Sequence, residues 1–312
     1  MVFEQQALAP GPGTWEKPPL GGPQDESALS GSSIFKSPAL PEVMIKGKPM
    51  ADYSQIDRSP LLSFLFYPRG DTTPCPEGAF DLLVPVEKGI SIGCRFYAGH
   101  PGWPWILFFH GNGEVASDYD EIAPFYHQEE INLVVADYRG YGASGGSPGF
   151  THLIHDGHLV FKAVREELSR KGLEESLWVM GRSMGSLSAV ELAYHYPEEM
   201  KGVIVESGFA SVTRLIKHLN LPARGLNLDP IEEERLAMIR QIAVPALILH
   251  GELDMLVPLQ EAKDLYHHLN SSKKKLVIIP NADHNTIMFA DLKRYFSEIQ
   301  EFVQGTKLPE IP

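Results

Sequence analysis

The chain has 312 residues, of which 43% are hydrophobic and 21% charged, a balance that is ordinary for a soluble globular protein and too apolar for a disordered one. Lys and Arg number 27 against 40 Asp and Glu, and the resulting net charge of −13 argues against a nucleic-acid backbone or an anionic membrane as the main partner. Two cysteines are too few for a disulfide framework or a four-ligand zinc site, and no run approaches the roughly 18 apolar residues of a transmembrane helix.

The N-terminal quarter differs in composition from the rest. Residues 1–41 contain 7 Pro and 5 Gly and predict a flexible arm, because such a segment buries too little apolar surface to offset its ordering entropy. Residues 42–78 include the apolar run 61–67 and predict an N-terminal appendage that packs on the domain. The start lacks the basic and apolar parts of a secretory signal and a lipidation box, so we expect a cytoplasmic location. Composition leaves the role of residues 1–78 open.

From residue 79 onward the pattern becomes regular. Two β-rich runs, 80–87 and 90–98, flank Lys88-Gly89 and predict an antiparallel hairpin. The expected strands are 105–109, 133–136, 177–180, 203–205, 246–249 and 276–279, and the expected helices lie near 119–127, 151–171, 184–196, 231–241, 259–269 and 286–304. Short apolar strands separated by helices indicate a mostly parallel sheet buried on both faces. Residues 79–305 therefore predict one doubly wound α/β domain, followed by a tail at 306–312.

The segment Gly181-Arg182-Ser183-Met184-Gly185 follows a predicted strand and opens a predicted helix. A serine at such a corner is held in a strained backbone conformation that exposes its hydroxyl, and the flanking glycines avoid collisions with the turn. In this context the pattern predicts that Ser183 is a catalytic nucleophile.

A nucleophilic serine needs a base, and the base needs a carboxylate to orient it. Asp254 and His284 follow the last two predicted strands, so both lie at the strand edge that carries Ser183. Glu252 is the second candidate for the acid. Asp283 is a poor one, because neighbours on a loop usually point apart. The sequence predicts a triad of Ser183, His284 and Asp254.

Acyl transfer also needs two fixed donors for the charge that develops on the carbonyl oxygen. The backbone N–H of Met184, next to the nucleophile, is one. The second is expected from the loop that follows the strand 105–109, at Asn112 or, as the alternative, at Gly113. We interpret His110, in the same loop, as a brace for the loop.

Six motifs occur in order and carry a resemblance to a known family: His110-Gly111-Asn112-Gly113, Asp137-Tyr138-Arg139-Gly140-Tyr141-Gly142-x-Ser144, the serine corner, Glu206-Ser207-Gly208-Phe209, Gly251-x-x-Asp254-x-x-Val257-Pro258, and His284. Together they resemble the α/β-hydrolase superfamily, in the serine-hydrolase branch that holds abhydrolase-domain lipases, protein depalmitoylases and bacterial relatives. The resemblance implies an eight-stranded, mostly parallel sheet with helices on both faces, a serine triad and an oxyanion hole. It covers residues 79 to about 305.

In this fold, specificity resides in the segment after the strand that follows the nucleophile, here 207–243, which is short enough to be a lid. Leu215 and Leu219 are candidates for an acyl pocket, equally consistent with simple packing. Met255, beside the acid, and Ile287, past the base, make the surroundings apolar.

A rival cluster, His152, His155, Asp156 and His158, lies on one predicted helix at spacings that allow metal ligation. The inferred fold places this helix away from the catalytic edge, and the chemistry needs no metal, so none is expected. The sequence also lacks a phosphate-binding loop and a dinucleotide fingerprint, and no cofactor is expected.

The leading hypothesis is a serine hydrolase that cleaves carboxylic esters or thioesters through an acyl-enzyme. An aminopeptidase or amidase with the same triad is the alternative, and it would need a carboxylate, such as Glu206 or the run 232–234, to hold a free amine. A non-catalytic binding protein of the same fold is the third, disfavoured because all three triad residues are present. The expected partner is a small-molecule or acyl ester substrate, without nucleic acid or a transmembrane segment. Acyl-chain length, leaving group and oligomeric state stay open.

Overall fold

A computed structural model of the chain describes residues 44–45, 48–49, 52–173 and 176–305. The arm predicted for 1–41 and the tail predicted for 306–312 lie outside these ranges. A two-stranded antiparallel pair, β1 (Met44–Ile45) and β2 (Lys48–Pro49), precedes the main sheet. Within the described ranges, no helix combines the length and the apolar character needed to cross a membrane.

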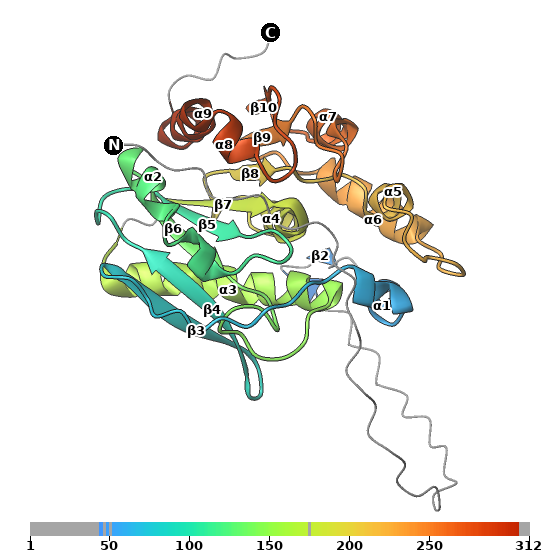
Figure 1. Ribbon diagram of the computed structural model, residues 1–312, viewed down its shortest axis with the longest axis horizontal. Helices are drawn as coiled ribbons and strands as arrows, with labels where there is room; N and C mark the ends of the chain where they lie inside the picture. The colour runs from blue at the N-terminus through green and yellow to red at the C-terminus, as the bar shows by residue number, and fades with distance from the viewer. Residues whose placement is uncertain (1–43, 46–47, 50–51, 174–175, 306–312) are drawn as a thin grey trace, which may run out of the picture. The chain divides into compact units, whose positions relative to one another are not determined.

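Eight strands form the central sheet in the order β10-β9-β8-β7-β5-β6-β4-β3 (Figure 1). The pairs from β6 to β10 are parallel, whereas β4 is antiparallel to both β6 and β3. The strands are β3 (Ala79–Glu87), β4 (Ile90–Tyr97), β5 (Trp105–Phe109), β6 (Asn132–Ala136), β7 (Leu177–Arg182), β8 (Val203–Glu206), β9 (Ala246–Gly251) and β10 (Lys274–Ile279). The predicted mostly parallel eight-stranded sheet is therefore confirmed.

Helices cover both faces of the sheet (Figure 1). Alternate residues of a strand point to opposite faces, so Leu107 and Phe109 of β5 enter one core cluster while Ile106 and Phe108 enter the other. The first core is closed by α3 (Phe150–Lys171), α4 (Ser186–His195), α5 (Val212–His218), α6 (Asp229–Ile239) and α7 (Leu259–His268), and the second by α2 (Ala123–Gln128), α8 (Ile287–Ala290) and α9 (Leu292–Gln304).

Two predicted helices are each split in the structure. The stretch expected at 286–304 breaks at Asp291, whose backbone leaves helical geometry and whose carboxylate accepts a hydrogen bond from the Arg294 N–H at 3.1 Å. Asp291 is thus the N-cap of a second helix. The stretch expected at 119–127 begins instead with a 3-10 turn at Ala116–Tyr119, and α2 starts one residue before Pro124, since proline fits only the first turn of a helix.

Residues 52–78 pack against the first core through α1 (Ser54–Asp57) and a 3-10 turn at Pro60–Phe64. The buried side chains of this segment are Tyr53, Ile56, Leu61 and Phe66. Asp57 also accepts hydrogen bonds from the backbone N–H groups of Phe150 and Thr151, at 2.7 and 2.9 Å. Because Gly149 has no side chain to cap α3, the first free N–H donors of the helix are satisfied by Asp57, 93 positions before Phe150.

Candidate active site

Ser183 lies in the tight turn between β7 and α4, the two elements that the sequence predicts around it. Its φ of +51° is in the left-handed region, which is strained for a non-glycine residue. A β-carbon at Gly185 would lie 2.1 Å from the Phe109 carbonyl oxygen, and one at Gly181 would lie 2.3 Å from the Gly185 carbonyl oxygen. Only glycine fits at these two positions, which explains the spacing of the motif.

The structure brings the three residues of the predicted triad together. His284 Nε2 lies 3.0 Å from Ser183 Oγ, and His284 Nδ1 lies 2.7 Å from Asp254 Oδ2. Ser183 and His284 retain 9% and 6% exposure, and Asp254 retains 4%. In this order a buried carboxylate orients the imidazole, and the imidazole is within hydrogen-bond reach of the hydroxyl proton.

The carboxylate of Asp254 is fixed from its other side. Its Oδ1 accepts hydrogen bonds from the backbone N–H groups of Leu256 and Val257, at 3.0 and 2.8 Å. His250, buried at the end of β9, lies 3.5 Å from Asp254 Oδ2 and donates from Nε2 to the Val257 carbonyl at 2.8 Å. Burial lowers the pKa of His250 and outweighs the opposing effects of the Val257 carbonyl and Asp254. Sequence analysis missed His250, although its position four residues before Asp254 was the available signal.

The two other candidates for the acid have different partners. Glu252 accepts a hydrogen bond from the Asn281 N–H at 3.1 Å. Asp283 accepts from the hydroxyl and backbone N–H of Thr286 and from the Asn285 N–H, and these bonds hold its pKa below the usual value. Neither carboxylate is bonded to His284, so the geometry favours Asp254.

The loop after β5, which carries Asn112, is held by the N-terminal segment. Asn112 Nδ2 donates to the Leu65 carbonyl at 2.9 Å, and its Oδ1 accepts from the Tyr67 N–H at 3.0 Å and the Tyr141 hydroxyl at 2.6 Å. Arg69 Nε donates to the Gly113 carbonyl at 3.0 Å. The side chain of Asn112 is therefore engaged by the N-terminal segment and by Tyr141.

His110 and the loop after β6 brace the same region. His110 is fully buried, with Nδ1 2.8 Å from the Gly111 carbonyl and Nε2 3.2 Å from Asp137 Oδ1. Arg139 binds Asp156 of α3 through two hydrogen bonds, at 2.6 and 3.0 Å. These contacts tie neighbouring loops together at a distance from the reacting hydroxyl.

Arg182, immediately before the serine, binds three other residues of the site. Its Nη1 lies 2.9 Å from Glu114 Oε1 and its Nε lies 3.1 Å from Glu206 Oε1, while Nη2 donates to the His284 carbonyl at 2.9 Å. Burial raises the pKa of the Glu206 carboxyl, and Arg182 opposes that rise. Glu206 also accepts from the Tyr295 hydroxyl at 2.7 Å. Sequence analysis gave Arg182 no role.

Replacing Arg182 with methionine is expected to lower the free energy of unfolding by about 3–5 kcal/mol, because Glu206 would stay buried without its cationic partner. Urea unfolding measures this change. The double variant Arg182→Met/Glu206→Gln should recover a large part of the loss, since the fully buried charge would be gone and Glu114, the other partner of Arg182, is partly exposed. A double variant as unstable as the single one would contradict this explanation.

The residues predicted to contact substrate lie in different environments. Met255 is 79% exposed. Ile287, the first residue of α8, is 1% exposed and belongs to the second core. Leu215 and Leu219 are half-buried, on α5 and directly after it. The end of α5 reaches the acid loop, because His218 Nε2 lies 2.8 Å from the Met255 carbonyl.

Exposed large apolar side chains gather on the segments that carry the triad and the Asn112 loop. Six residues of this kind lie next to Asp254, past His284 or on the segment that binds Asn112, and together we call them the apolar rim: Phe64, Tyr67, Leu253, Met255, Leu256 and Phe289.

The rival metal cluster does not assemble as a unit. The Asp156 carboxylate binds Arg139 and also lies 3.1 Å from His155 Nδ1. His152 lies near the Ser147 carbonyl, and His158 points to α4.

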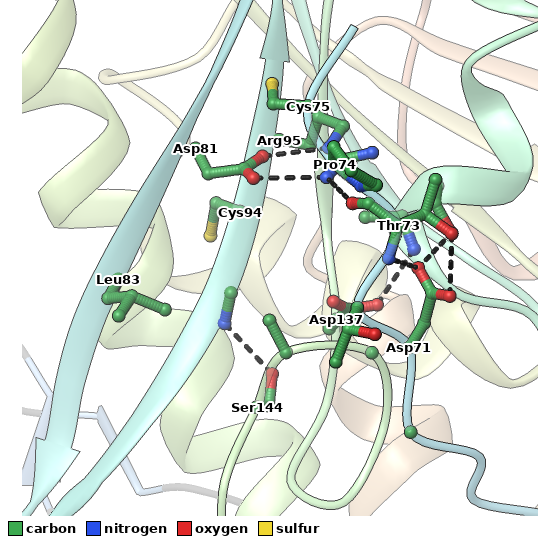
Figure 2. A pocket seen from close by; sticks show the side chains of 17 residues that line it. Asp71, Thr73, Pro74, Cys75, Asp81, Leu83, Cys94, Arg95, Asp137 and Ser144 are labelled. Atoms are coloured by element: carbon green, nitrogen blue, oxygen red, sulfur yellow. Dashed lines mark hydrogen bonds and ion pairs between the residues drawn. The ribbon is translucent and has the colours of Figure 1, made fainter.

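A cavity of about 690 Å³ lies away from Ser183, between residues 70–75 and strands β3 and β4 (Figure 2). Its charged groups already have partners: Arg95 binds Asp81 at 2.8 Å, and Asp71 accepts from the Ser117 hydroxyl at 2.6 Å. Cys94, also in its lining, is buried, and burial raises the pKa of its thiol well above the usual range. Burial thus disfavours the reactive thiolate form of Cys94.

The sheet, with a serine at the turn after its central strand β7, defines the class of protein as an α/β-hydrolase. The family described as serine aminopeptidase, S33, matches residues 104–227 and 233–290, which is more than half of the chain. The chain therefore belongs to this family of hydrolases.

Similar proteins span bacteria, archaea and eukaryotes. The chain is 27% identical over 230 residues to the protein YfhR of Escherichia coli K12, covering 72% of this chain and 80% of that protein. It is 28% identical over 225 residues to α/β hydrolase domain-containing protein 17C of Xenopus tropicalis, covering 70% and 67%. Among solved structures, the Pyrococcus furiosus esterase Pf2001 is similar with a TM-score of 0.63 and 18% identity, covering 77% of this chain and 98% of that one. At this identity the likeness establishes the shared fold.

Proposed function

We propose that this protein is a serine hydrolase that cleaves carboxylic esters and thioesters through an acyl-enzyme. The observation that carries the proposal is the hydrogen-bonded series from Ser183 Oγ through His284 to Asp254 Oδ2, with distances of 3.0 and 2.7 Å. All three groups are nearly buried, where such interactions are stronger than in water.

In the first half-reaction Ser183 Oγ attacks the acyl carbon and His284 Nε2 takes the hydroxyl proton. The tetrahedral intermediate collapses, the bond to the leaving alcohol or thiol breaks, and His284 returns the proton to that group. Water then attacks the acyl-enzyme with His284 again as base, which releases the acid and restores Ser183. Asp254 stabilises the imidazolium that forms in each half.

Two backbone N–H groups are the proposed donors to the oxyanion. The N–H of Met184 lies beside the nucleophile, and that of Asn112 lies in a loop whose side-chain contacts with Leu65, Tyr67 and Tyr141 hold it rigidly. Preorganised donors cost no reorganisation as charge develops, which is the usual source of the largest catalytic effect.

The apolar rim supports a substrate with an acyl chain, because covering exposed carbon stabilises a complex by about 25 cal/mol per Å². The family description suggests an aminopeptidase as a second function. That activity requires a carboxylate to bind a free amine, and Glu206 is 1% exposed and engaged by Arg182 and Tyr295. These contacts favour the ester over the amine.

A fluorophosphonate probe is expected to label the purified protein once, on the peptide that contains Ser183, as identified by mass spectrometry. Initial rates on p-nitrophenyl esters from acetyl to palmitoyl are expected to exceed those on aminoacyl arylamides, because the apolar rim suits acyl groups and Glu206 is engaged by Arg182 and Tyr295. The KM should fall as the chain lengthens, by at most about fourfold per methylene.

Faster turnover of the arylamides would move the assignment to an aminopeptidase. Failure of the probe to label the protein would overturn the serine hydrolase proposal itself.

A further inference from the structure

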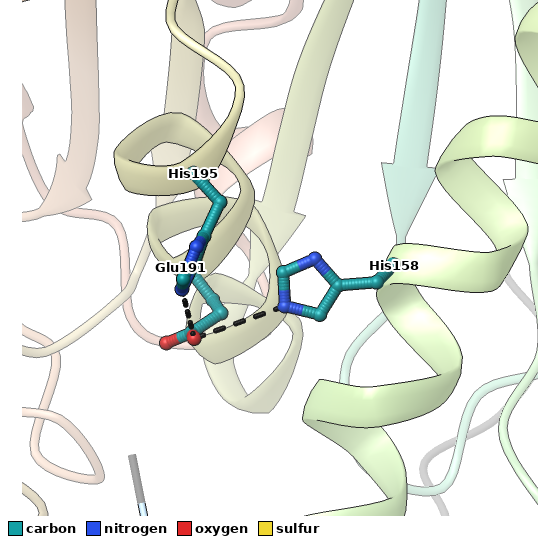
Figure 3. Close-up of side chains that lie close together, drawn as sticks. All are labelled: His158, Glu191 and His195. Carbon is teal, nitrogen blue, oxygen red and sulfur yellow. Dashed lines mark hydrogen bonds and ion pairs between the residues drawn. The ribbon is translucent and has the colours of Figure 1, made fainter. Parts of the chain in front are cut away.

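Three buried side chains that the hydrolytic mechanism does not use lie together between α3 and α4. His158 comes from α3, and Glu191 and His195 are four residues apart on α4. Figure 3 shows the Glu191 carboxylate between the two imidazole rings, one from its own helix and one from the facing helix. Each residue is 1% exposed. In the described part of the chain, these three form a group whose potential ligand atoms all lie within 4.8 Å of one another.

The distances within the group match a metal coordination sphere. Glu191 Oε1 lies 3.0 Å from His195 Nε2 and 3.8 Å from His158 Nε2. Two ligands at zinc distances of about 2.1 Å and a tetrahedral angle are roughly 3.4 Å apart. The observed separations fall on either side of this value, so small rotations of the side chains would place all three atoms around one ion.

Two atoms of the group lack partners although they are buried. His158 Nε2 and Glu191 Oε2 have no hydrogen bond. Buried polar atoms are almost always satisfied, because an unpaired one loses its hydrogen bonds to water without replacement. At 3.8 Å, the contact between His158 Nε2 and the carboxylate is too long for a hydrogen bond. A cation bound by His158 Nε2 and by both oxygens of the Glu191 carboxylate would satisfy both atoms.

A fourth residue orients one of the rings. The Tyr196 hydroxyl lies 3.2 Å from His158 Nδ1, on the side of the ring opposite to Glu191. When Nδ1–H donates to this hydroxyl, Nε2 has a free lone pair, and ligand histidines are commonly held in this way.

We propose that His158, Glu191 and His195 bind a divalent transition-metal ion, with Zn²⁺ the best match to two imidazoles and one carboxylate. Mg²⁺ and Ca²⁺ prefer oxygen ligands and suit this donor set poorly. The ion ties α3 to α4, and α4 begins three residues after Ser183. Its role is therefore structural: it fixes the helix that carries the serine turn. Because the site is buried, the ion binds during folding.

The test uses the full chain, refolded from urea with a chelator or with one equivalent of Zn²⁺ or Co²⁺. We expect one ion per chain after desalting, by elemental analysis, and the visible absorption bands of tetrahedral Co²⁺. Glu191→Gln and His195→Gln should each weaken binding by more than the 10- to 100-fold loss typical of a residue that only orients a ligand, and Tyr196→Phe should cause about that smaller loss. His267→Gln, an exposed histidine on α7, is the matched control and should bind normally.

X-ray absorption of the zinc-loaded wild type gives a second reading that does not depend on the variants. We expect nitrogen and oxygen neighbours with the outer-shell signature of imidazole. Sulfur neighbours would assign the ion to Cys75 or Cys94 and overturn the proposal. Absence of stoichiometric metal in the refolded wild type, or unchanged binding in Glu191→Gln, would overturn it as well.

Discussion

Replacing Ser183 with alanine is expected to reduce kcat for ester hydrolysis by on the order of 10⁶-fold, while the protein stays folded. The effect is large because no other hydroxyl is hydrogen-bonded to His284 in the described part of the chain, so the acyl-enzyme cannot form. Removing the hydroxyl also leaves the strained backbone of the turn in place, since alanine keeps the β-carbon. Initial rates on a p-nitrophenyl ester measure the loss, and circular dichroism checks the fold.

Ser188→Ala is the matched control for that experiment. Ser188 is buried on α4, and its hydroxyl donates to the Leu153 carbonyl at 3.2 Å, away from His284. Its replacement should cost about 1 kcal/mol of stability and leave kcat unchanged. Ester turnover that survives in Ser183→Ala, in a preparation free of contaminating esterases, would contradict the assigned nucleophile.

Replacing Asp254 with asparagine is expected to lower kcat by about 10⁴-fold, through the tautomer of His284. The side-chain oxygen at position 254 is held toward the Leu256 and Val257 N–H groups, so an asparagine would place its oxygen there and its NH₂ toward His284. His284 Nδ1 would then have to accept a hydrogen bond. Its Nε2 would carry the proton and could no longer take one from Ser183.

The measurement is kcat at neutral pH, compared with that of Glu252→Gln. Glu252, the second candidate for the acid, bonds to the Asn281 N–H, so its variant should retain wild-type kcat. A large loss in Glu252→Gln together with a small one in Asp254→Asn would reverse the assignment of the acid.

The fold and the three triad positions could be predicted from the sequence because their signals are local. Alternating apolar strands and helices define the sheet, and the glycines beside Ser183 report a backbone that tolerates no β-carbon. Asp254 and His284 follow from the rule that the carboxyl ends of parallel strands share one edge. The split of the last helix at Asp291 was missed because a single capping side chain overrode a continuous amphipathic pattern.

The surroundings of the triad could not be predicted in the same way, because they depend on tertiary packing. Arg182 joins Glu114 and Glu206, which are separated from it by 68 and 24 positions, and spacing alone gives no sign of this. The histidines at 152, 155 and 158 also show that spacing along a helix does not determine which side chains meet. Their spacing favours a shared site, but His158 turns instead to residues of α4 that no helical periodicity connects to it.

The contacts of Asn112 show that the segment matched by the family and the structural unit around the site differ in extent. The family match begins at residue 104. The loop proposed to donate a hydrogen bond to the oxyanion is nevertheless held by Leu65 and Tyr67, which precede the match. Asp57, which caps α3, precedes it as well. The segment that matches the family is therefore shorter than the structural unit around the proposed site. A chain reduced to the matched segment would lack the groups that hold this loop and cap α3, so residues 52–78 belong to the same structural unit as the proposed oxyanion hole.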